Sequence, residues 1–345
     1  TEWRDIVNPA TQEVLARVPF ATAAEIEGAI ASAAKAFVAW RETPVGARMR
    51  IMLKLQELIR RDMKKIAACL TAEQGKTLAD AEGDVFRGLE VVEHACSVGS
   101  IQMGEHLEQV AGGVDVYSVR QPLGVCAGIT PFNFPAMIPL WMFPMAIVAG
   151  NTFVLKPSEQ DPMTTMLLAE LALEAGVPPG VLNVIHGGKA AVDALCTHPA
   201  IRAVSFVGST PVGNHVYRLA SQNGKRAQCM MGAKNHAVVL PDAHKEQSLN
   251  ALVGAGFGAA GQRCMAISVA VLVGRAKEWI PDLVAKAKSL KVSAGTEPGA
   301  DLGPLVSKAA KARVLSLIEA GVKEGATLEL DGRGLSVPGY PEGNF

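Results

Sequence analysis

The stretch Val125-Cys-Ala-Gly-Ile-Thr-Pro-Phe-Asn-Phe-Pro135 joins a short apolar run to a polar turn that is rich in proline. Three further apolar runs of similar length follow, at 152–155, 182–185 and 203–206. Segments with helical character separate the runs, at 142–148, 164–175 and 190–195. Strands that alternate with helices predict a parallel sheet with right-handed crossovers, and therefore an α/β fold.

Polar motifs follow three of these apolar runs, where ligands bind in parallel sheets. Asn133 is either a turn residue or an amide donor to an oxyanion. Lys156 and Glu159 form either a solvated surface pair or a clamp on ribose hydroxyls. The segment 208–210, Gly-Ser-Thr, opens a helix whose N-terminus offers N–H groups to a phosphate, although the G-x-G-x-x-G fingerprint is absent.

A thiol that can carry chemistry lies in Gly258-Ala-Ala-Gly-Gln-Arg-Cys-Met-Ala266. A thiolate is the nucleophilic form of cysteine, and a neighbouring cation or backbone N–H donors favour it. Arg263 and the flanking glycines therefore suggest a turn that presents Cys264 to a cleft. From these residues alone, Cys264 is either a nucleophile or a buried thiol.

Composition limits the class of protein. A chain of 345 residues, 49% of them hydrophobic, predicts two domains more readily than one. Lys plus Arg equals Asp plus Glu at 33 each, so we expect no nucleic-acid partner. The six cysteines contain no C-x-x-C pair, which indicates reduced thiols and no metal site. The most apolar run, 136–150, is too short for a bilayer span and contains two prolines, so we expect no membrane partner.

The remaining segments read as supporting elements. Asn8-Pro9 predicts a turn between short strands, and Thr22 with Glu25 forms a capping box at the start of a helix. Further helices are expected after Pro44 and from 73 to about 97, where Arg87 reads as a surface arginine. Alternation over 113–120 predicts an edge strand. Beyond the cysteine loop we expect a strand at 270–273 and helices at 277–290 and 308–324.

Gly261-Gln-Arg-Cys-Met-Ala266 resembles the nucleophile loop of aldehyde dehydrogenases, in particular their CoA-acylating methylmalonate-semialdehyde branch. The Asn-Phe-Pro motif at 133–135 and the motifs after the other strands extend the resemblance along nearly the whole chain. It implies a dinucleotide-binding domain, a catalytic domain and a hairpin that builds a homodimer or homotetramer. The dinucleotide-binding domain would comprise 1–106 and 123–233. The catalytic domain would comprise 234–345, and the hairpin would comprise 107–122. Related chains continue past Phe345 with a Glu-Phe-Gly-Pro motif, so we expect this chain to be incomplete.

The resemblance also implies a role for individual residues. Cys264 would be the nucleophile, and Asn133 would donate to the oxyanion. Arg87 and Arg263 would hold a substrate carboxylate, as paired guanidiniums can. NAD would be bound by residues after the strands, namely Thr130, Phe132, Lys156, Glu159, Gln160, Gly208 and Ser209.

Met230 stands where the non-acylating enzymes of this family have a glutamate that activates water. Since a thioether is no base, the acyl-enzyme would persist until the thiol of coenzyme A arrived. We therefore expect NAD-dependent oxidation of methylmalonate or malonate semialdehyde through a Cys264 thioester. Decarboxylation and transfer to CoA would follow. The alternatives are a hydrolytic aldehyde dehydrogenase for another carboxylated aldehyde and a non-catalytic relative. The expected location is a bacterial cytoplasm or the mitochondrial matrix.

Overall fold

The computed structural model describes residues 2–345, which divide into two compact units. The first unit contains residues 2–4, 18–66 and 83–231. The second unit contains residues 5–17, 67–82 and 232–345. This division differs from the expected domain boundaries, because 5–17 and 67–82 group with the C-terminal part of the chain. Sequence periodicity does not report which distant segment a strand or helix end packs against.

A five-stranded parallel sheet with strand order β7-β6-β5-β8-β9 forms the centre of the first unit. The strands are β5 (Val125–Ile129), β6 (Thr152–Lys156), β7 (Leu182–Val184), β8 (Ile201–Val207) and β9 (Arg226–Met230). The α/β prediction and its four strands are confirmed. The fifth, β9, was not predicted, because this edge strand has alternating exposure and polar residues instead of a continuous apolar run.

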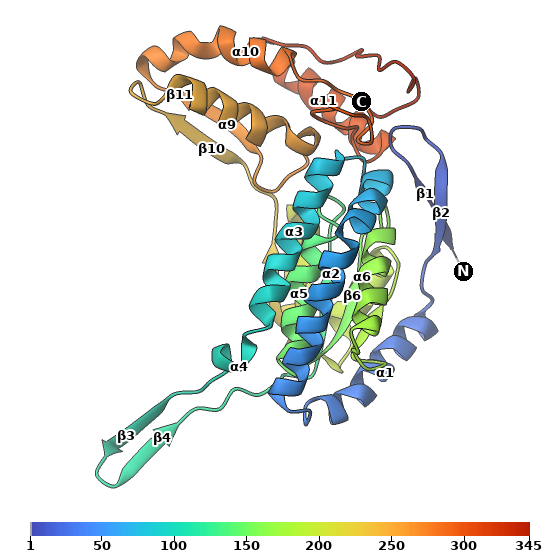
Figure 1. Ribbon diagram of the computed structural model, residues 1–345, viewed down its shortest axis with the longest axis vertical. Coiled ribbons are helices and arrows are strands. Elements are labelled where there is room, and N and C mark those ends of the chain that lie inside the picture. The colour runs from blue at the N-terminus through green and yellow to red at the C-terminus, as the bar shows by residue number, and fades with distance from the viewer. Residues whose placement is uncertain (1) are drawn as a thin grey trace. The chain divides into compact units, whose positions relative to one another are not determined.

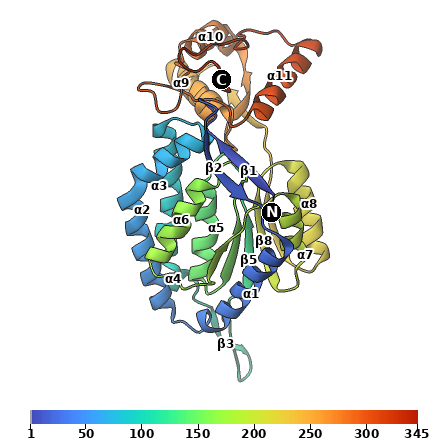
Figure 2. The same cartoon turned by 90° about the vertical axis from the view of Figure 1, so that its right-hand side faces the viewer.

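Helices cover both faces of this sheet (Figure 2). The helices between residues 23 and 222 are α1 (Ala23–Trp40), α2 (Val45–Gln74), α3 (Leu78–Ala95), α4 (Val98–Ile101), α5 (Met137–Val148), α6 (Met163–Glu174), α7 (Lys189–Thr197) and α8 (Thr210–Gln222). Helices α1, α7 and α8 pack on one face, where Ile26 and Ile30 of α1 join Val125, Ala127 and Ile129 of β5 in the core. The burial of both faces explains why β5 reads as a continuous apolar run.

Helix α5 begins earlier than the predicted residue 142. Pro139 lies in its first turn, where a backbone N–H has no intrahelical acceptor, so the proline costs little there. The N–H of Met137 instead donates to the Asp84 side chain at 2.7 Å. A long-range carboxylate cap therefore starts this helix, which local sequence does not reveal.

An antiparallel hairpin of β3 (His106–Ala111) and β4 (Val114–Tyr117) extends away from the helices of its unit (Figure 1). The expected edge strand at 113–120 is thus paired, and the hairpin begins at His106, one residue before the predicted range of 107–122. All residues of both strands are exposed. Leu107 and Val116 face each other across the pair as exposed apolar side chains.

The second unit contains a parallel pair of strands and several helices around the cysteine loop. The elements are β10 (Asn235–Val239), α9 (Lys245–Phe257), the 3₁₀ turn η1 (Gly258–Gly261), β11 (Ile267–Leu272), η2 (Gly274–Trp279), α10 (Ile280–Lys288) and α11 (Lys308–Lys323). The strands β1 (Trp3–Val7) and β2 (Val14–Pro19) form a separate two-stranded sheet. Among the described residues, no helix is both long and apolar enough to cross a bilayer.

Candidate active site

The carboxyl edge of the parallel sheet carries a buried polar cluster. Thr130 follows β5, and its N–H donates to the carbonyl of Lys156 at 3.1 Å. The Thr130 hydroxyl is buried and has no hydrogen-bond partner among the residues that the structure describes. Phe132 and Gln160, also expected at this edge, are half-buried. The edge therefore holds an unsatisfied buried polar atom, which is uncommon in folded proteins.

Lys156 and Glu159 form an ion pair with an Nζ–Oε2 distance of 3.0 Å. The Lys156 side chain is only 6% exposed, so the interpretation of this pair as a solvated surface pair is wrong. Burial alone would raise the pKa of Glu159, but the Lys156 ammonium outweighs it and lowers that pKa. An ion pair between a buried lysine and a half-buried glutamate thus lies at the end of β6.

His186 lies beyond the end of β7, near this pair, and was not predicted as part of the edge. Burial lowers the pKa of His186, and the Lys156 charge lowers it further, so the imidazole is neutral at pH 7. Its Nδ1 atom is buried and has no partner among the described residues. In the sequence, His186 is marked only by its position directly after the third apolar run. A loop residue without any function can occupy the same position.

The N-terminus of α8 is open to an anion. Ser209 is the N-cap and makes no capping hydrogen bond through its hydroxyl to any described residue, and Pro211 follows in the first turn. A Cβ at Gly208 would lie 2.5 Å from the Phe206 ring, so only glycine fits there. The free hydroxyl, the first-turn N–H groups and the helix dipole suit a phosphate.

Asn133 lies in the turn between β5 and α5 and is half-buried. Proline on either side, at 131 and 135, restricts the backbone of this turn. The side chain therefore projects from a stiff segment that follows a buried strand. Asn133 belongs to the first unit, together with the other residues of the sheet edge.

The cysteine loop of the second unit begins with an unusual backbone. Ala259, Ala260 and Gly261 all have positive φ, at 51°, 54° and 74°. A left-handed conformation costs an alanine about 1–2 kcal/mol, and such strain is characteristic of functional sites. Cys264 follows and is half-buried, and its carbonyl accepts a 2.8 Å hydrogen bond from the Asn235 side chain. The predicted turn before the cysteine is therefore confirmed in a strained form.

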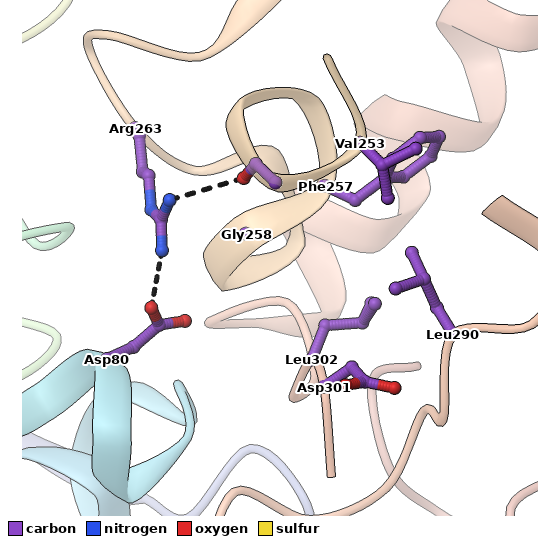
Figure 3. Close-up of a pocket in the computed structure, with 9 residues that line it drawn as sticks. Asp80, Val253, Phe257, Gly258, Arg263, Leu290, Asp301 and Leu302 are labelled. Atoms are coloured by element: carbon purple, nitrogen blue, oxygen red, sulfur yellow. Dashed lines mark hydrogen bonds and ion pairs between the residues drawn. The ribbon is translucent and has the colours of Figure 1, made fainter. Parts of the chain in front are cut away.

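Arg263 points to an acidic partner within the same unit (Figure 3). Its Nη2 pairs with Asp80, and its Nη1 donates to the carbonyl of Gly254 at 3.4 Å. These residues line a cavity of about 420 Å³, together with Val253, Phe257, Gly258, Leu290, Asp301 and Leu302. The side chain is 27% exposed, so it retains access to solvent.

Arg87 and Met230 are both accessible residues of the first unit. The Arg87 side chain is 66% exposed and pairs with Glu90 at 3.0 Å on α3, as expected of a surface arginine. Its assignment to a substrate carboxylate stays a prediction. Met230 ends β9 with 47% of its surface exposed, and its carbonyl accepts the Gly208 N–H. Its thioether provides no proton acceptor for water activation.

Burial makes the thiolate less favourable at four of the other five cysteines. Burial raises the pKa of both Cys126 and Cys196 to about 11. It also raises the pKa of Cys96 and Cys229. Within residues 2–345, no group of three or more His, Cys, Asp or Glu side chains could hold a metal ion.

Comparison with known proteins gives matches along the full chain. A human protein named methylmalonate-semialdehyde/malonate-semialdehyde dehydrogenase [acylating], mitochondrial, is 61% identical over 344 residues, which cover all of this chain and 64% of that protein. An Arabidopsis thaliana methylmalonate-semialdehyde dehydrogenase [acylating], mitochondrial, is also 61% identical, over 99% of this chain and 56% of that protein. This chain therefore spans less than two thirds of the length of these two relatives.

Solved structures share the fold. The crystal structure of a methylmalonate-semialdehyde dehydrogenase from Oceanimonas doudoroffii matches with a TM-score of 0.98 and 47% identity, over all of this chain and 71% of that one. A structure from Sinorhizobium meliloti 1021 complexed with NAD matches with a TM-score of 0.97 and 48% identity, over all of this chain and 70% of that one. A family model described as "Aldehyde dehydrogenase family" matches residues 1–345. Together with the parallel sheet and the cysteine loop, these matches show that the chain belongs to the aldehyde dehydrogenase family.

Proposed function

We propose that this chain carries the nucleophile and the cofactor-binding edge of a CoA-acylating, NAD-dependent dehydrogenase for methylmalonate or malonate semialdehyde. The observation that carries the proposal is Cys264 on its strained turn, in a chain 61% identical to relatives named for this activity. A strained backbone at 259–261, in the same loop as a half-buried thiol, favours a functional role over a purely structural one.

The chemistry begins when Cys264 Sγ attacks the aldehyde carbon and the carbonyl oxygen becomes an alkoxide. We assign stabilisation of this oxyanion to the Asn133 side-chain amide and the backbone N–H of Cys264. Loss of hydride then leaves a thioester on Cys264. With a β-carboxylate, the thioester carbonyl accepts the electron pair as CO₂ leaves, and the α-carbon is protonated. The CoA thiol attacks the thioester and releases the Cys264 thiolate, giving propionyl-CoA or acetyl-CoA.

The residues at the sheet edge fit NAD. The buried, unpartnered hydroxyl of Thr130 and the ion-paired Lys156 and Glu159 provide polar groups for the adenosine ribose. Gly208 and Ser209 provide the helix N-terminus for the pyrophosphate, and we assign Phe132 and Gln160 to the same site. When bound, NAD supplies the hydride acceptor. We accordingly propose that the first unit is the dinucleotide-binding domain and the second the catalytic one.

Substrate selection would depend on arginine. We propose that Arg87 and Arg263 bind the substrate carboxylate, as paired guanidiniums can. Acyl transfer to CoA instead of water is supported by Met230, which cannot activate water. For a eukaryotic source we propose the mitochondrial matrix as the location, and for a bacterial source the cytoplasm.

The decisive experiment compares products formed by the full-length protein with and without CoA. We expect propionyl-CoA and CO₂ from methylmalonate semialdehyde with NAD and CoA, and little turnover without CoA. Equal rates with release of a free acid would support the hydrolytic alternative. A folded protein that binds neither NAD nor aldehyde would support the non-catalytic alternative.

A further inference from the structure

Asp80 contacts the cysteine loop at two places. It lies in the first turn of α3, and its side chain is 22% exposed. One carboxylate oxygen pairs with Nη2 of Arg263, and the other accepts the N–H of Ala259 at 3.2 Å. The two oxygens therefore bind the residue that opens the left-handed turn and the residue that directly precedes Cys264.

The contact at Ala259 bears on the strained backbone. The N–H of Ala259 belongs to the first of three consecutive residues with positive φ. A strained segment persists only when its surroundings determine its conformation. A charge-assisted hydrogen bond from a carboxylate is stronger than a neutral one, so Asp80 favours this turn over relaxed alternatives.

The contact at Arg263 fixes the direction of a guanidinium that also packs on the loop. A Cβ at Gly258 would lie 2.3 Å from Nη1 of Arg263, so the guanidinium lies directly against this glycine. Arginine has five N–H donors in a rigid plane. Asp80 and the Gly254 carbonyl each accept a hydrogen bond from one Nη atom of Arg263, and together they orient the guanidinium plane. The remaining N–H groups of Arg263 can still donate to a substrate carboxylate.

We propose that Asp80 is a positioning residue, which orients Arg263 for the substrate carboxylate and holds the turn that presents Cys264. The inference rests on the proposed function. The proposed role of Asp80 differs from that of a plain ion pair in a measurable way. A plain ion pair affects folding, whereas a positioning residue affects the choice between substrates with and without a carboxylate.

The test uses the full-length protein with the variants Asp80→Asn, Arg263→Leu and the double variant. Glu82→Gln is the matched control, because Glu82 is an exposed carboxylate on the same helix. The measurements are kcat/KM for methylmalonate semialdehyde and for propanal, which has no carboxylate, together with the melting temperature. Hydrogen–deuterium exchange of the peptide spanning 254–266 reports on the turn independently of activity.

We expect Asp80→Asn to lower the ratio of the two kcat/KM values by about tenfold, since an arginine without its anchor binds the carboxylate less well. Arg263→Leu should lower the ratio at least as much, and the double variant no further, because residues of one interaction are not additive. Exchange at 254–266 should accelerate in Asp80→Asn and stay unchanged in Glu82→Gln. Asp80→Glu should restore part of the ratio.

Two results would overturn the inference while leaving the proposed function intact. In one, Arg263→Leu lowers the ratio but Asp80→Asn does not. In the other, Asp80→Asn lowers both kcat/KM values equally while exchange at 254–266 stays as in Glu82→Gln. If the wild-type protein forms no acyl-CoA, the proposed function fails instead. The exchange measurement then tests separately whether Asp80 holds the turn. Equal protection of 254–266 in Asp80→Asn and Glu82→Gln would show that it does not.

Discussion

Asn133 is held by the turn between two prolines, at the carboxyl end of β5. If it donates to the oxyanion, Asn133→Ala should lower the acylation rate by roughly two to three orders of magnitude, the usual effect of removing one such donor. Single-turnover measurement of NADH formation by the full-length protein checks this. Asn223→Ala, at an exposed helix end, is the control. Weaker NAD binding with an unchanged rate would contradict the assigned role.

The cysteines should differ in how their alkylation depends on pH. A raised pKa means that the thiolate forms only at higher pH, so Cys126 and Cys196, with pKa values of about 11, stay protonated near pH 8. We expect iodoacetamide to modify Cys264 first at pH 7–8, because it is half-buried and follows Arg263. Mass spectrometry of the labelled peptides measures the order. Earlier labelling of Cys69 or Cys96 would reject Cys264 as the nucleophile.

At the scale of elements, α1 is stabilised by a complete capping box. The Thr22 hydroxyl accepts the Glu25 N–H, and a Glu25 carboxylate oxygen accepts the Thr22 N–H at 2.7 Å. Thr22→Ala should therefore lower the free energy of unfolding by about 1 kcal/mol. Urea denaturation measures the loss, with exposed Thr327→Ala as the control. Equal stability of the two variants would show that the cap contributes nothing.

At the scale of the whole molecule, the β3–β4 hairpin exposes apolar side chains, and we propose that they form an interface with another copy of the chain. Leu107 and Val116 are 57% and 50% exposed on facing positions. If the hairpin builds the interface, Val116→Asp in the full-length protein should shift the mass in solution toward the monomer, because burying a carboxylate is costly. Light scattering measures the mass. Val38→Asp on α1, at a 69% exposed valine, should leave it unchanged.

The sequence by itself determined the elements whose signals are local. Continuous apolar runs predicted β5, β6, β7 and β8, because a parallel strand buries both faces. The capping box predicted where α1 begins, since its hydrogen bonds lie within four residues. Glycines and a cation around Cys264 predicted the turn that the structure contains. The family motifs could also be recognised residue by residue.

Tertiary structure alone decided the features that depend on partners far along the chain. Helix α5 begins where it does because Asp84 caps Met137 across 53 residues. Asp80 lies 183 residues from Arg263, and no periodicity pairs them. The sequence allowed Lys156 and Glu159 to be interpreted as a surface pair, whereas tertiary packing buries the lysine. Propensity, caps and periodicity act over a few residues, whereas burial and long-range ion pairs exist only once the chain has folded.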